Sequence, residues 1–369
     1  MCSSDLIILI ILVFGVIIFF HELGHFIVAK INHITVKEFS MGFGPKLFQF
    51  HKKETQYTLR LIPLGGYCMM LSEDDEENEN DENSFEKKSI WARMAVVLAG
   101  PAMNFVIAFL FSMVIIHFCG SDPAIIGAVY NKDNIEKYQI ENAEEYFNGV
   151  YPAEEAGISD GDQVLKIEGS TVKNFRELQI YLQIYGDGSP IDLTLEKEDG
   201  TVYDTTVHPA KTPDGYKIGI MSVGYQLPKN FGELCKYSAY ETRYWVKATF
   251  LSLKLIVTRQ VSSDEVSGPV GVAKNMNDTF NEAAKSSVLD LFLNWMNYIV
   301  LLSANLGVMN LLPIPGLDGG RFIFLLIEAV TRKKVPKDKE NIVTLIGFVL
   351  VMLLMVVILF NDIKNVFFH

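Results

Sequence analysis

The stretch HELGH places two histidines and a glutamate, His21, Glu22 and His25, at a spacing suited to metal chemistry. On a helix the two histidines are one turn apart on the same face, so both imidazoles can bind one metal ion. In the H-E-x-x-H pattern the metal is zinc, and the glutamate acts as general base in hydrolysis. The pattern predicts that His21 and His25 are zinc ligands and that Glu22 is catalytic.

The residues immediately before this motif, LIILIILVFGVIIFF, contain no ionisable side chain. An ionisable residue at the centre of a membrane span costs at least about 2.5 kcal/mol, so three of them together need a compensating partner. The alternative is that they lie at the membrane interface, just before Lys30, and extend their polar ends towards water. We favour a metal ion as the partner, because the residue types and spacing are those of the zinc pattern.

A catalytic zinc site normally has three protein ligands and one open position for water, so a third ligand must come from elsewhere. Asp318 in NLLPIPGLDGG is the candidate, because it follows a long apolar segment that two prolines interrupt. Broken backbone at membrane depth is tolerated where it lines a cavity. The alternative role for Asp318 is to cap a helix beginning near Gly319. The four cysteines show no CxxC spacing, which gives no support for a thiolate metal site or a disulfide framework.

The elements that carry these motifs are expected to cross a membrane. Of the 369 residues, 49% are hydrophobic, and the mean hydropathy is positive at +0.22. A helical span takes about 20 apolar residues. Four segments meet this requirement: residues 6–30, 92–118, 291–312 and 342–360. The first span is expected to be retained, because it lacks the basic start and the small-residue cleavage site of a secretory signal. The fold class is a multi-pass α-helical membrane protein.

The distribution of charge predicts the orientation of these spans. Residues 331–340, TRKKVPKDKE, are basic and join the last two spans, so they are expected in the cytoplasm. By alternation, residues 32–90 are cytoplasmic and residues 120–229 lie on the other side. The net charge of the chain is −12, and eight of its acidic residues lie in EDDEENENDE, residues 73–82. That run is typical of a solvated linker, and no nucleic-acid partner is expected.

The segment between the second and third spans changes from helical to alternating periodicity, as in QVLKIEG and IDLTLEKEDG. It is therefore expected to be an inserted β-rich domain. Residues 151–178 resemble a circularly permuted PDZ domain, with a strand at 164–167 and a helix beginning near Asn174. The stretch 131–150 is longer and more polar than a PDZ connection requires. The expected domains are residues 1–119 as the first part of the membrane core, 120–230 as the extracytoplasmic PDZ-like domain, and 231–369 as an interfacial helix and the second part of the core.

Taken together, HELGH, AGPAMN at residues 99–104, the PDZ-like insert and the Asn-x-x-Pro-x-Pro-x-Leu-Asp-Gly-Gly pattern resemble a site-2 protease of the bacterial regulator-of-sigma-E-protease type. GFGPKLF and RLIPLGGY add to the resemblance, which runs from the first span to the last. It implies an intramembrane zinc endopeptidase of the bacterial inner membrane, with its active site near the cytoplasmic side. The implied substrates are single-span membrane proteins, such as anti-sigma factors or remnant signal peptides, cut in regulated intramembrane proteolysis. A single PDZ-like domain distinguishes the chain from two-domain members.

The resemblance also assigns roles to residues outside HELGH. Asn310 would hold the substrate main chain beside the metal, although an interhelical hydrogen bond is the alternative. Residues 56–70, with Gly65 and Gly66, would re-enter the membrane as a β-hairpin and offer an edge to an unwound substrate. The alternative is a cytoplasmic hairpin. Residues 233–257 are aromatic and amphipathic, which predicts a helix at the membrane surface.

Two other function classes compete with a protease. In a scaffold, the PDZ-like domain would capture envelope proteins and zinc would serve structure alone. Glu22 argues against this class, because a structural zinc site needs no base. A metal-ion carrier would need ligands staged across the bilayer, and the remaining histidines form no second cluster in the sequence.

Overall fold

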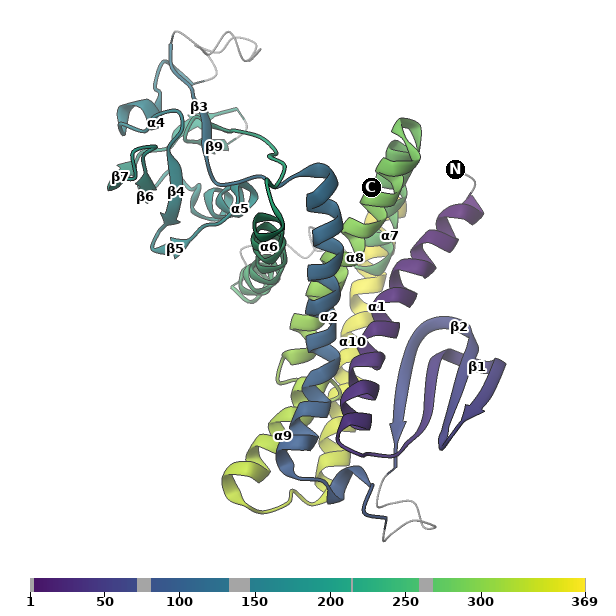
Figure 1. Ribbon diagram of the computed structural model, residues 1–369. Coiled ribbons are helices and arrows are strands. Elements are labelled where there is room, and N and C mark those ends of the chain that lie inside the picture. Colours follow the sequence, from purple (N-terminus) through teal and green to yellow (C-terminus); the bar gives the residue numbers. More distant parts are fainter. Residues whose placement is uncertain (1–2, 72–80, 133–146, 214, 259–267, 369) are drawn as a thin grey trace. The chain divides into compact units, whose positions relative to one another are not determined.

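The computed structural model describes residues 3–71, 81–132, 147–213, 215–258 and 268–368. The acidic run at 73–82 and the polar stretch at 131–150 lie largely outside the described residues. The chain divides into two compact units, one formed by residues 1–112 and 249–369 and the other by residues 113–248. The first unit holds the membrane helices and the second holds most of the strands (Figure 1).

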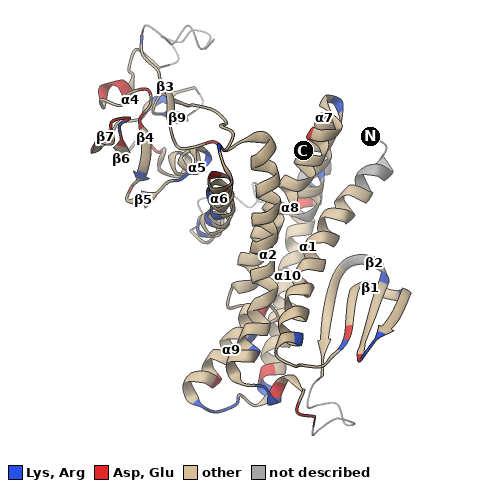
Figure 2. Ribbon diagram, viewed as in Figure 1, with Lys and Arg blue, Asp and Glu red and all other residues tan. Residues whose placement is uncertain are grey.

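Among the described residues, four helices are long and apolar enough to cross a membrane, which confirms the four expected spans at the level of length and composition. Figure 2 shows that charged residues are sparse along their length. In the most apolar stretch of the last helix only 6% is buried within the protein, whereas 44% of the corresponding stretch of the third helix is buried. Much of the last helix is therefore available to lipid. The four helices are α1 (Ser3–Ile31), α2 (Ile90–Cys119), α8 (Val288–Leu311) and α10 (Lys337–Phe368).

The centre of the membrane unit is an apolar cluster that joins α1, α2 and α8 to a further helix, α7 (Pro269–Ser286). Phe280 of α7 and Ile299 of α8 have no exposed surface. The start of α7 is held by Asp362 of α10, whose carboxylate accepts hydrogen bonds from the amides of Gly268 and Gly271 at 3.0 and 2.8 Å. The last span therefore caps the start of α7.

The proline-containing segment predicted to break the third span does so. Helix α8 ends at Leu311, and a new helix, α9 (Asp318–Thr331), begins after Pro313 and Pro315. Leu317 occupies the N-cap position of α9 without a side-chain cap. Asp318 is the first helical residue, so the capping role considered for it is not observed.

The two glycines after Asp318 allow α9 to begin close against the broken backbone. A Cβ atom on Gly319 would lie 2.1 Å from the carbonyl oxygen of Leu312, and one on Gly320 would lie 2.4 Å from that of Ile314. Further along α9, Glu328 forms a bidentate ion pair with Arg93 of α2, with N to O distances of 2.6 and 3.0 Å. These contacts hold α9 against the segment that precedes it and against α2.

A β-hairpin lies beside the first span. Strands β1 (Val36–Lys52) and β2 (Thr55–Met70) pair, and β2 packs against α1 (Figure 1). The last part of β2, residues 66–70, pairs with residues 36–41 of β1. Apolar side chains on the hairpin are exposed: Phe43, Leu47, Phe48, Leu59, Leu61 and Ile62. A short 3-10 helix, η1 (Phe85–Lys87), precedes α2.

The second unit contains a four-stranded sheet in the order β5 (Ser170–Thr171), β4 (Gln163–Ile167), β6 (Ile191–Glu196) and β7 (Val202–Val207). Two strand pairs accompany it: β3 (Ile126–Val129) with β10 (Ile220–Ser222), and β8 (Ala210–Thr212) with β9 (Gly215–Lys217). Two helices complete this part, α4 (Pro152–Glu155) and α5 (Phe175–Tyr185). The strand expected at 164–167 and the helix expected near residue 174 are both confirmed. Asn174 starts α5 by accepting a hydrogen bond from the amide of Glu177 at 2.8 Å.

Helix α6 (Phe231–Val257) follows, and its first part belongs to the second unit. Its cations bind a nearly buried carboxylate on α5. Arg243 lies 3.0 Å and Lys247 lies 2.5 Å from the carboxylate oxygens of Glu177, and Arg176 of α5 pairs with Glu241 of α6. The predicted helix at 233–257 is therefore present, and its first part is fastened to α5 by ion pairs.

Candidate metal centre

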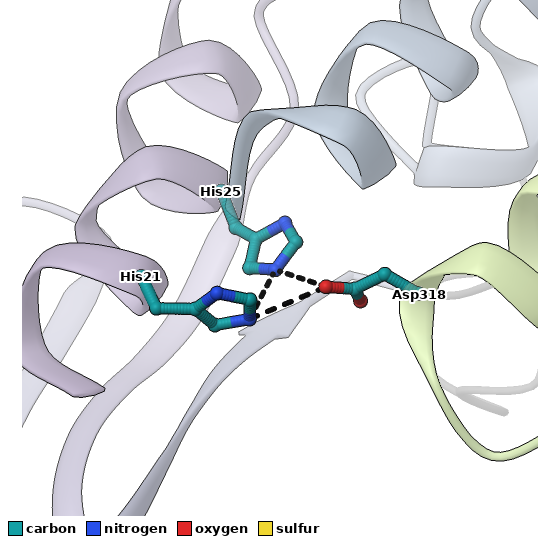
Figure 3. Close-up of side chains that lie close together, drawn as sticks. All are labelled: His21, His25 and Asp318. Carbon is teal, nitrogen blue, oxygen red and sulfur yellow. Dashed lines mark hydrogen bonds and ion pairs between the residues drawn. The ribbon is translucent and has the colours of Figure 1, made fainter. Parts of the chain in front are cut away.

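His21, His25 and Asp318 converge on one point although Asp318 lies almost three hundred residues further along the chain (Figure 3). Helix α1 presents the two imidazoles from successive turns, and the first residue of α9 presents the carboxylate. Asp318 Oδ2 lies 3.2 Å from His21 Nε2 and 3.4 Å from His25 Nε2. The two Nε2 atoms are 3.3 Å apart. The three atoms thus form a nearly equilateral triangle.

The size of this triangle fits a tetrahedral metal site. Zinc to nitrogen or oxygen bonds of about 2.0–2.2 Å place neighbouring ligand atoms about 3.3–3.6 Å apart. The donor set, two imidazoles and one carboxylate, also suits zinc and leaves a fourth position open. Burial raises the pKa of Asp318, but the two neighbouring imidazoles outweigh burial and hold that pKa below its usual value. The carboxylate is therefore ionised at neutral pH, as ligation requires.

The far nitrogen of each imidazole contacts helix α2. His25 Nδ1 lies 2.8 Å from the carbonyl oxygen of Val96, and His21 Nδ1 lies 3.1 Å from the side-chain nitrogen of Asn104. Both imidazoles are nearly buried, with 9% of each residue exposed. Because each ring is held on the side away from the cluster, its Nε2 atom is directed towards the other ligands.

Two glycines allow α1 and α2 to approach closely enough for these contacts. A Cβ atom on Gly24 would lie 2.3 Å from the carbonyl oxygen of Ala99. A Cβ atom on Gly100 would lie 2.2 Å from His25 Nε2 and 2.8 Å from His21 Cε1. Gly24, Gly100 and Asn104 lie within HELGH and AGPAMN, but neither motif by itself indicates a role for them. Glycine is unfavourable inside a helix, so its presence in HELGH and AGPAMN was the available signal.

A cavity of about 200 Å³ adjoins the three ligands. Glu22 lines it and accepts a hydrogen bond from the backbone amide of Cys68 in β2. Gly66 also lines it, and a Cβ atom there would lie 3.1 Å from Glu22 Cγ. Of the other residues predicted for substrate binding, neither Gly65 nor Asn310 is among the described residues that line this cavity. Of the predicted substrate-binding residues, Gly66 therefore lines the cavity beside Glu22.

Two further cavity residues were not anticipated. Burial and the nearby Glu22 carboxylate raise the pKa of the Cys68 thiol to about 12, so this thiol is neutral at pH 7. Arg321 lies one turn after Asp318 with its guanidinium carbon 4.5 Å from the centre of the Phe85 ring. The cavity therefore combines a carboxylate, a neutral thiol and a cation beside the candidate metal ligands.

Known proteins similar to this chain carry names that agree with this arrangement. A protein of Clostridium acetobutylicum, provisionally named a zinc metalloprotease, is 37% identical over 359 residues, covering 97% of this chain and 97% of the relative. Zinc metalloprotease RasP of Geobacillus kaustophilus is 32% identical over 443 residues, with 99% of each chain covered. Regulator of sigma-W protease RasP of Bacillus subtilis is 29% identical over 438 residues, with 97% and 98% covered. A family model described as Peptidase family M50 matches residues 9–354. Because this match takes in nearly the whole chain, the protein belongs to peptidase family M50.

Proposed function

We propose that this chain is a membrane-embedded zinc endopeptidase in which His21, His25 and Asp318 bind the metal. The observation that carries the proposal is the convergence of their three ligand atoms, 3.2–3.4 Å apart, beside a carboxylate that is not part of the cluster. Zinc bound by these residues supplies an activated water and polarises the peptide carbonyl. The names of the relatives, which specify zinc metalloproteases, support the choice of metal.

Glu22 is the general base in this proposal. It follows His21 directly on α1 and lines the same cavity, so its carboxylate can take a proton from the water and pass it to the leaving amine. The Cys68 amide donates to this carboxylate and restricts its orientation. A structural metal site has no use for a carboxylate held free of the metal, so Glu22 favours hydrolysis over a scaffold role.

The substrate is a single-span membrane protein whose helix must unwind before a peptide bond can be attacked. The last part of β2, residues 66–70, has one strand partner among the described residues and contacts α1 beside Glu22. Its other side offers main-chain groups to an extended substrate. Exposed apolar side chains on the hairpin suit immersion in the membrane. By the resemblance alone, Gly65 and Asn310 are further proposed substrate contacts.

The setting is the bacterial inner membrane, with the active site near the cytoplasmic face. The basic segment 331–340 follows α9, whose first residue is Asp318, and excess Lys and Arg mark cytoplasmic loops. The HELGH motif likewise lies in the later part of α1, before the cytoplasmic hairpin region. Residues 120–230 are then extracytoplasmic. Anti-sigma factors or remnant signal peptides are the proposed substrate class, which the sigma-W name of one relative supports.

The second unit is proposed to act as a PDZ-like filter for substrates. It contains a cavity of about 790 Å³ between α5 and residues 215–220, with Phe147, Leu182 and Lys217 among its lining. A groove whose lining combines apolar side chains with a cation suits the end of a peptide chain. Replacing Leu182 with Arg should change which tagged substrates are cut while zinc content stays normal. An unchanged substrate range in the folded variant would show that this groove does not select substrates.

The decisive experiment separates proton transfer from metal binding. Glu22→Gln keeps nearly the same shape but cannot accept a proton at neutral pH, so turnover should fall by about 10² to 10⁴ while zinc remains. Tagged single-span anti-sigma factors and signal peptides would be co-expressed with wild-type or Glu22→Gln protein. Cleavage and zinc content would be measured in the same membrane preparation. Near-normal cleavage by the zinc-loaded variant would refute the mechanism.

A further inference from the structure

The two candidate histidine ligands differ in what lies behind them. The partner of His25 Nδ1 is the carbonyl oxygen of Val96, 2.8 Å away, and a carbonyl can only accept. His25 therefore carries a proton on Nδ1, so in the neutral imidazole the lone pair of Nε2 faces the cluster. Its tautomer is the one a metal ligand needs, whether or not a metal is bound.

The partner of His21 Nδ1 imposes no such choice. It is the side-chain amide of Asn104, whose nitrogen lies 3.1 Å away. In this orientation the amide donates and Nδ1 accepts, so the ring proton is on Nε2, next to Asp318 Oδ2 at 3.2 Å. To bind a metal through Nε2, His21 must instead carry its proton on Nδ1. Nδ1 then needs an acceptor.

Asn104 can supply that acceptor without losing another interaction of its oxygen. Its Oδ1 atom is buried and has no hydrogen-bond partner in the described part of the chain. A half-turn of the amide exchanges its nitrogen and oxygen and places Oδ1 towards the imidazole. The same side chain can therefore serve either tautomer of His21.

The rest of Asn104 is fixed in place. The residue has no exposed surface, and its backbone carbonyl oxygen accepts a hydrogen bond from Ser303 of α8 at 2.9 Å. Ser303 is also fully buried. Asn104, on α2, is thus held between α1 and α8. A residue fixed on a rigid helix can hold a metal ligand in one orientation.

We propose that Asn104 is a positioning residue for the metal centre, whose amide oxygen faces His21 Nδ1 when zinc is bound. The inference rests on the zinc ligation of the proposed function and adds a residue to it. Asn104 acts through His21 and touches neither the metal nor the substrate. It selects the ligating tautomer and the orientation of the ring, and its loss should weaken zinc binding before it affects any other step.

The test is zinc affinity, measured by competition with a chromophoric chelator on purified full-length protein. Asn104→Leu keeps the size of the side chain but removes the acceptor, and the dissociation constant for zinc should rise about 10- to 100-fold. Asn104→Asp keeps an acceptor in the same place and should bind zinc at least as tightly as wild type. Asn305→Leu is the matched control, because Asn305 accepts a hydrogen bond from Thr249 on another helix, and its zinc affinity should not change.

Wild-type affinity in folded Asn104→Leu would overturn the proposal. An equal loss of zinc affinity in Asn104→Leu and Asn104→Asp would also overturn it. If Asn104 served structure alone, a buried carboxylate would be tolerated no better than leucine. If the Leu variant does not fold, the Asp variant compared with wild type still decides the question. The proposed function fails separately, if wild-type protein binds no zinc or if His25→Ala leaves its affinity unchanged.

Discussion

Substituting Gly100 by alanine should empty the metal centre, even though alanine is normally the better residue inside a helix. An Ala in place of Gly in a helix interior ordinarily stabilises by about 1 kcal/mol. Here the new Cβ atom would lie 2.2 Å from His25 Nε2 and 2.6 Å from His25 Cε1. Comfortable contacts between such atoms are about 3.5 Å, so the ring must move by more than about 1 Å.

The His25 ring cannot move that far and still bind the metal. Ligand distances at a metal site tolerate about 0.2 Å, and the ring is also held by the carbonyl of Val96. Loss of a partner behind a ligand already costs about 10- to 100-fold in affinity, so loss of the ligand itself should cost at least about 100-fold. Proteolysis should fall with the zinc.

The assay is zinc content and zinc affinity of purified Gly100→Ala protein, together with its thermal unfolding in detergent. Gly15→Ala in α1 is the control, because a Cβ atom there meets nothing within 4 Å. It should keep full zinc content and fold at least as well as wild type. Full zinc occupancy in folded Gly100→Ala would refute the close approach of α2 to the imidazoles, and with it the geometry of the site.

Three further changes test the ligand set and the contacts that place it. Asp318→Ala should reduce bound zinc, because one of three protein ligands is removed, and full occupancy by metal analysis would move the third-ligand assignment to another residue. Arg93→Met should destabilise the protein by about 3–5 kcal/mol, because the carboxylate of Glu328 loses its partner in a site where only 17% of that side chain is exposed. The double variant with Glu328→Met should recover most of the lost thermal stability, and additive losses would show that the two residues are not coupled. Asp362→Ala should cost about 1–2 kcal/mol and speed amide exchange at the start of α7, since one buried and one partly buried donor lose their acceptor. Asp338→Ala, at an exposed position in α10, is the control and should exchange as wild type does.

Local patterns in the sequence were sufficient for the elements of this protein. Four apolar stretches predicted four candidate membrane helices, because length and apolarity are properties of each segment by itself. The strand at 164–167 lies in a stretch of alternating periodicity, and the helix near Asn174 was expected from the resemblance to a PDZ domain. The spacing of His21 and His25 likewise placed both imidazoles on one face before any packing was known.

Tertiary structure decided what these elements bring together. From sequence, Asp318 could cap a helix as well as bind a metal, although the two motifs together favoured ligation. Only the packing of α9 shows Leu317 at the cap position and the Asp318 carboxylate beside the histidines. Gly100 and Asn104 gain their roles from the distance between α1 and α2, which depends on many side chains far apart in the chain. A periodic pattern reports which face of one helix is apolar, but not which residue of another helix lies against it. The first kind of information is local and was readable, whereas the second exists only once the chain has folded.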